Sequence, residues 1–112
     1  MKIKKVTYRG GMIEKLSDKI KLDEIVLLGD EIPQNILDVI DETKIIEIGG
    51  VYGDDKVGVP ILYDLLTIEF DNTIITIEAF NITIFLIKTN DAYIKRVFKV
   101  LAQFQRLMRK KT

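Results

Sequence analysis

The sequence predicts an α+β domain in which a mainly antiparallel sheet packs against a C-terminal amphipathic helix. Residues 65–70, 73–79 and 82–88 are runs rich in Ile, Thr and Phe that are separated by two-residue links. Residues 92–109 repeat apolar side chains at helical spacing. The chain has 112 residues, 47% of them hydrophobic, as expected for one globular domain over residues 1–112. The sheet is expected either to stay open or to curl into a partly closed barrel.

The N-terminal part is predicted to begin with a strand over residues 2–8, ended by Arg9-Gly10-Gly11. Residues 12–21 fit both a helical and an alternating pattern, so both assignments stay open. Residues 24–29 form a short apolar run that ends in glycine, which indicates a buried strand.

A short helix is predicted after Pro33, because proline is favoured in a first helical turn and Ile36, Leu37 and Ile40 follow on one side. The next strand is predicted over residues 44–48.

The glycine-rich stretch 49–58 is predicted to be a hairpin turn between strands at residues 48–52 and 57–63. Its spacing matches neither the P-loop nor the dinucleotide-binding fingerprint. The adjacent Asp54 and Asp55 make it a poor anion site, and two carboxylates are too few to hold a divalent cation alone.

The second half is predicted to be a three-stranded antiparallel meander. Asp71-Asn72 is a link that tolerates positive φ and therefore predicts a hairpin, and Phe80-Asn81 is a similarly tight link. The last run, residues 82–88, is apolar on both faces. Such a strand is expected either to be central and covered twice or to present one face to a partner.

The C-terminal helix is predicted to start after an N-cap in Thr89-Asn90-Asp91 and to bury an apolar stripe centred on Ile94, Val97 and Leu101. Its opposite face is basic, and this basic face is the candidate binding site, since its side chains could contact phosphates without reading sequence. The five residues of the basic face are Lys95, Arg96, Lys99, Arg106 and Lys110. Four basic residues in and just after the first strand are expected to extend this surface if that strand lies nearby: Lys2, Lys4, Lys5 and Arg9.

The charges are segregated along the chain although the formal net charge is zero. Residues 1–21 carry a net +5, residues 22–87 a net −12 and residues 88–112 a net +7. This asymmetry indicates a basic surface for a polyanion, or complementary patches that stabilise the fold or an oligomer.

The residue types also limit the chemistry. Without Cys or His there can be no disulfide, no Cys or His zinc site and no histidine general base. The acids Glu47, Asp64, Glu69 and Glu78 are expected mostly on a solvated strand face, with no pair at a defined distance. No enzyme activity, cofactor or metal is therefore predicted.

The leading prediction of function is a non-enzymatic interaction module that self-associates and binds a protein partner, with nucleic-acid binding through the basic face as the alternative. No apolar stretch is long enough to span a bilayer, so a cytoplasmic location is expected. The richness in Ile, Lys and Glu fits either a thermophile protein or an AT-rich genome.

The ending of the chain, a meander over residues 65–88 followed by Thr89-Asn90-Asp91-Ala92 and an amphipathic helix, resembles the last strands and closing helix of pleckstrin-homology-like domains. It is also similar to the roadblock family of dimerising domains, although residues 51–66 do not supply the long helix which that family has before its final meander. The first resemblance implies a module that binds a lipid headgroup or a protein. The second implies a dimer with a protein partner.

Overall fold

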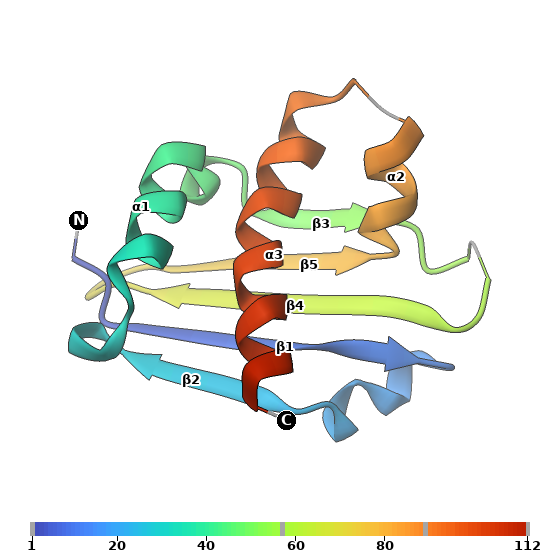
Figure 1. Cartoon of the computed structure of the whole chain (residues 1–112), viewed down its shortest axis with the longest axis horizontal. Coiled ribbons are helices and arrows are strands. Elements are labelled where there is room, and N and C mark those ends of the chain that lie inside the picture. The colour runs from blue at the N-terminus through green and yellow to red at the C-terminus, as the bar shows by residue number, and fades with distance from the viewer. Residues whose placement is uncertain (1, 57, 89, 112) are drawn as a thin grey trace.

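The computed structural model describes residues 2–56, 58–88 and 90–111, and within them one five-stranded sheet carries its α-helices on one face (Figure 1). The strands are β1 (Lys5–Ile13), β2 (Glu24–Leu28), β3 (Gly50–Gly53), β4 (Ile61–Glu69) and β5 (Ile74–Phe80). The α-helices are α1 (Gln34–Thr43), α2 (Ile82–Lys88) and α3 (Ala92–Lys111), and the short 3-10 helices are η1 (Leu16–Lys21), η2 (Gly29–Glu31) and η3 (Ile45–Glu47).

The sheet has the strand order β2-β1-β4-β5-β3. All neighbours are antiparallel except β3 and β5, which are parallel. The predicted α+β class with a mainly antiparallel sheet is confirmed, and of the two alternatives for the sheet the open form is the one observed. It ends in the edge strands β2 and β3 (Figure 1).

The main core lies between the sheet and the helices. Helix α3 crosses the sheet and turns its apolar stripe onto β1, β4 and β5, as predicted (Figure 1). Asp91 Oδ1 accepts a hydrogen bond of 2.9 Å from the backbone N–H of Tyr93, as expected of an N-cap, whereas Thr89 lies outside the described residues. The main core consists of Val6, Tyr8, Ile32, Ile36, Ile40, Ile45, Leu66, Ile68, Phe70, Ile77, Ala79, Ile82, Ile94, Val97, Val100, Leu101 and Phe104.

The predicted hairpin across Asp71-Asn72 is confirmed as β4–β5, but the predicted third strand of the meander is wrong because residues 82–88 form helix α2. The outer edge of β5, where a third antiparallel strand would pair, is occupied by β3. Asn81 adopts the left-handed conformation with φ 55° and turns the chain out of the sheet. Ile82 then enters the main core, while Ile87 is 84% exposed.

The hairpin predicted around residues 53–56 is also wrong, since β3 and β4 are not neighbours in the sheet. The backbone of Gly53 lies so close to β5 that a Cβ there would meet the carbonyl oxygen of Phe80 at 1.8 Å. Residues 45–47 form η3 rather than a strand. Val57, the first residue of the predicted strand 57–63, lies outside the described residues, and β4 begins only at Ile61, just after Pro60.

Two predictions for the N-terminal strands are corrected. Strand β1 continues through Gly10 and Gly11 to Ile13 instead of ending at the glycines. Residues 24–28 do form a strand, but it is an edge strand whose Val26 and Leu28 are 46% and 52% exposed.

The short helix after Pro33 is confirmed as α1, with Ile36 and Ile40 in the main core.

Candidate functional site

The predicted basic face of α3 is largely exposed, and two of its residues contact α1 within the monomer. Lys95, Lys99, Arg106 and Lys110 are exposed, and Arg96 is half-buried. Lys99 forms an ion pair with Glu42 of α1. Arg96 donates a hydrogen bond of 3.1 Å from Nη1 to the backbone carbonyl of Thr43, and its guanidinium lies 5.0 Å from the ring centroid of Tyr93. Two of the five predicted site residues therefore hold α1 against α3.

Lys5 and Arg9 do not extend this basic face, so the prediction is wrong for these two residues. On β1 they alternate with Val6 and Tyr8, whose side chains enter the main core under α3. Lys5 and Arg9 therefore point to the other side of the sheet.

On that other side, the open face, the described part of the chain places no α-helix (Figure 1). The strand registers align its side chains in rows across the sheet. The central row is small and uncharged, and the rows on either side of it carry the charges. The central row consists of Val26, Thr7, Thr67 and Thr76; one flanking row consists of Leu28, Lys5, Glu69 and Ile74, and the other of Glu24, Arg9, Leu65 and Glu78.

The charged side chains of the open face pair with one another within the monomer. Lys5 lies 3.9 Å from Glu69, between Nζ and Oε2. Arg9 Nη2 donates to Glu24 Oε2 at 2.8 Å. In the same row, Glu78 is paired with Lys19 of η1, with 3.3 Å between Oε2 and Nζ. The open face is therefore close to neutral.

Helix η1 lies against one end of the open face and borders a hollow of about 370 Å³. Thr7, Leu65 and Thr67 line it from the sheet, and Ile20, which is 79% exposed, lines it from η1. The hollow lies beside a small second cluster of buried side chains that consists of Ile13, Ile61, Tyr63 and Phe80.

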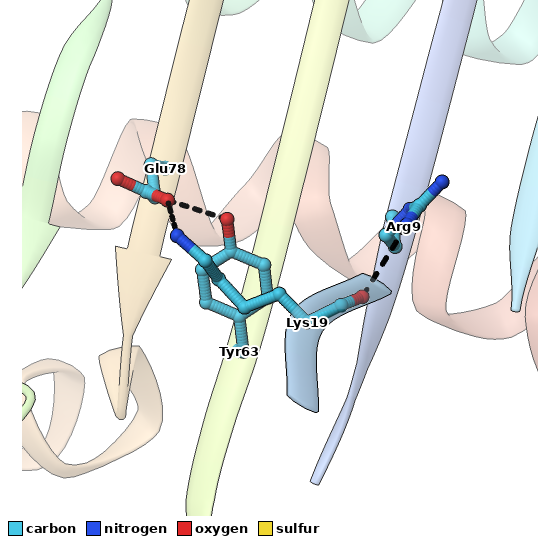
Figure 2. A network of polar contacts seen from close by, with 4 residues as sticks. All are labelled: Arg9, Lys19, Tyr63 and Glu78. Carbon is cyan, nitrogen blue, oxygen red and sulfur yellow. Dashed lines mark hydrogen bonds and ion pairs between the residues drawn. The ribbon is translucent and has the colours of Figure 1, made fainter. Parts of the chain in front are cut away.

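A polar network fixes η1 to the sheet (Figure 2). Tyr63 donates a hydrogen bond from its hydroxyl to Glu78 Oε2, the oxygen that also accepts from Lys19 Nζ. Lys19 Nζ lies 5.2 Å from the centroid of the Tyr63 ring, and Arg9 Nη1 donates to the Lys19 carbonyl at 3.3 Å. Burial, followed by the hydrogen bond to Glu78, raises the pKa of Tyr63, so the phenol stays a neutral donor.

The prediction that Asp64 lies on a solvated strand face is wrong. Its side chain is fully buried under α3 rather than on a solvated face. Tyr8 donates its hydroxyl to Asp64 Oδ1, and Gln105 Nε2 donates to the same oxygen at 3.1 Å. Burial raises the pKa of Asp64, and these two hydrogen bonds oppose the rise. The alternation Asp64, Leu66, Ile68 was the signal that places this carboxyl on the core side of β4.

The buried Asp64 cluster depends on a glycine. Tyr8 runs along β1 above Gly10, where a Cβ would lie 2.1 Å from the tyrosine hydroxyl. A side chain at position 10 would therefore push the hydroxyl off Asp64. Asp64 is wholly buried between the sheet and α3. Its hydrogen bonds with Tyr8 and Gln105 link β4 to β1 and α3, and its carboxyl is closed to a substrate.

Comparisons with models of known families, with curated proteins and with solved structures find no match to this chain. Within the described residues no helix is long and apolar enough to cross a membrane. In the same part of the chain, no group of three acidic side chains is placed to hold a metal ion.

Proposed function

We propose that this chain is a non-enzymatic interaction module that self-associates through the open face of its sheet. The observation that carries the proposal is the central row of small, uncharged side chains, flanked by ion pairs that are already complete within the monomer. Burying an unpaired charge in an interface is costly, whereas a charge that keeps its partner costs less. A second neutral sheet face can therefore cover this one without leaving an unpaired charge.

A second copy fits the open face because a two-fold interface presents the same patch twice. The exposed apolar side chains Val26, Leu28 and Ile74 lie at the two sides of this face. Ile20 of η1 projects beside the hollow, so a two-fold axis near η1 would let each Ile20 enter the hollow of the other copy. Burial of these side chains is the expected source of affinity.

The test is the mass of the protein in solution, from about 1 to about 100 µM, where weak interfaces dissociate. The wild type is expected to have about twice the 12.9 kDa mass of the chain, at both low and high salt. The double variant Val26→Lys with Thr67→Lys puts two unpaired charges in the central row and is expected to be a monomer with an unchanged circular dichroism spectrum.

The matched control is Ile87→Lys, which removes a larger exposed apolar side chain from α2 on the other side of the sheet. It is expected to remain dimeric. A wild type that stays monomeric over the whole concentration range, or a dimer that Ile87→Lys dissociates and the double variant does not, would overturn the proposal.

The nucleic-acid alternative stays a prediction with its own test. The other three residues of the basic face form no ion pair with a residue that the structure describes: Lys95, Arg106 and Lys110. If they contact phosphates, labelled DNA or RNA should bind at about 50 mM salt, weaken steeply at about 200 mM, and be lost when all three are changed to Glu. We favour self-association because Arg96 and Lys99 are engaged within the monomer. Salt-sensitive binding that the triple variant abolishes would favour the alternative.

A further inference from the structure

A second hollow, of about 570 Å³, lies on the helix side of the molecule, at the end of the sheet where α1 passes the β4–β5 hairpin. This volume falls within the range of sites that hold small molecules. Its apolar wall is made by Ile3, Leu37, Ile46 and Phe70, from four separate segments of the chain. Helix α1 buries Ile36 and Ile40 in the main core but leaves Leu37 only half-buried, so this apolar wall stays accessible.

Three carboxylates border this hollow, and unlike the charges on the open face they are not neutralised by ion pairs with described residues. Asp38 and Asp41 lie on α1 and Glu47 on η3. The charged side chains in the rows of the open face form ion pairs, whereas no ion pair joins these three carboxylates to any residue that the structure describes. Asp38 Oδ1 accepts a neutral hydrogen bond of 2.8 Å from Gln34 Nε2.

Two lysines, Lys2 and Lys44, also line the hollow, so the acids exceed the bases by one at its border. The local potential therefore favours a cation over an anion.

We propose that the hollow beside α1 binds a small amphiphilic cation, an apolar alkyl or aryl group that carries a primary ammonium. The apolar group would cover Leu37, Ile46 and Phe70, and the ammonium would lie near Asp38 and Asp41. This site is separate from the open face and does not depend on self-association.

The test compares three probes of equal length: hexylammonium, hexanol and hexanoate. Each is titrated into ¹⁵N-labelled protein while the amide resonances are followed by NMR. Hexylammonium is expected to shift the amides of Ile3, Leu37 and Ile46 with a Kd of about 1 mM or weaker, as its size dictates. Hexanol should bind at the same place more weakly, and hexanoate most weakly.

Variants of the carboxylates distinguish the contribution of charge to binding from the contribution of the apolar wall. Asp38→Asn with Asp41→Asn is expected to weaken hexylammonium about fivefold and to leave hexanol unchanged, because exposed ion pairs contribute little each. Asp23→Asn, at the start of β2 and away from the hollow, is the matched control and should change nothing. No shifts at these amides, hexanoate binding as tightly as hexylammonium, or equal affinities in wild type and double variant would each overturn the proposal.

Discussion

Replacing Phe104 with alanine is expected to lower the free energy of unfolding by about 3–5 kcal/mol. The ring is fully buried in the main core and stacks on Tyr8 with 5.3 Å between centroids. Its removal would lose apolar burial, leave a cavity under α3 and withdraw the surface that holds Tyr8 toward Asp64. A loss of this size is a large part of the roughly 5–15 kcal/mol that stabilises a small domain. Urea unfolding followed by circular dichroism measures it.

Tyr93→Ala is the control on the same helix, because its aromatic side chain is 52% exposed and lies outside the main core. It is expected to cost less than about 1 kcal/mol. Should Phe104→Ala fail to fold, Phe104→Leu keeps most of the volume and is expected to show a smaller loss in the same direction. A Phe104 variant that is no less stable than Tyr93→Ala would contradict the packing of α3 described above.

The second large effect is expected from Asp64 and depends on pH. Because burial raises its pKa in the folded state, the folded protein holds this proton more tightly than the unfolded chain does. The stability that protonated Asp64 contributes is therefore fully present below the ordinary aspartate pKa of about 3.9 and is lost as the pH rises through the raised folded value. Within that window the loss approaches about 1.4 kcal/mol per pH unit.

Asp64→Asn keeps an oxygen acceptor for Tyr8 and Gln105 but cannot ionise. The stability of the wild type relative to this variant is therefore expected to fall with rising pH, measured by urea unfolding from about pH 4 to about pH 8. Asp71→Asn removes a carboxylate from the exposed β4–β5 turn and controls for the general effect of one acid fewer. A wild-type advantage that stays level or grows with pH would show that Asp64 is ionised without strain in the folded state.

Several elements were predictable from the sequence because their signals are local. Helix α3 repeats apolar side chains over five turns, and that spacing fixes which side is buried wherever the helix packs. Proline before α1 and Asp71-Asn72 between β4 and β5 constrain the backbone through their own φ preferences. The predicted basic residues of α3 do lie together on one surface. Which of them are engaged by Glu42 and Thr43 depends on how α1 docks, and no spacing within α3 reveals that.

The predictions that failed concern residues whose state depends on distant neighbours. Residues 82–88 have the composition of a strand, but strand propensity measures the fit to a pleated surface and requires a free sheet edge. That edge of β5 is filled by β3, paired in parallel, and the segment 82–88 forms its hydrogen bonds within a helix instead. The rows of the open face likewise exist only once three strand registers are set, because each row joins residues from four strands. The sequence by itself therefore determined the amphipathic helices and the hairpin. The tertiary structure decided the strand order, the burial of Asp64 and the neutral sheet face that the described α-helices leave uncovered.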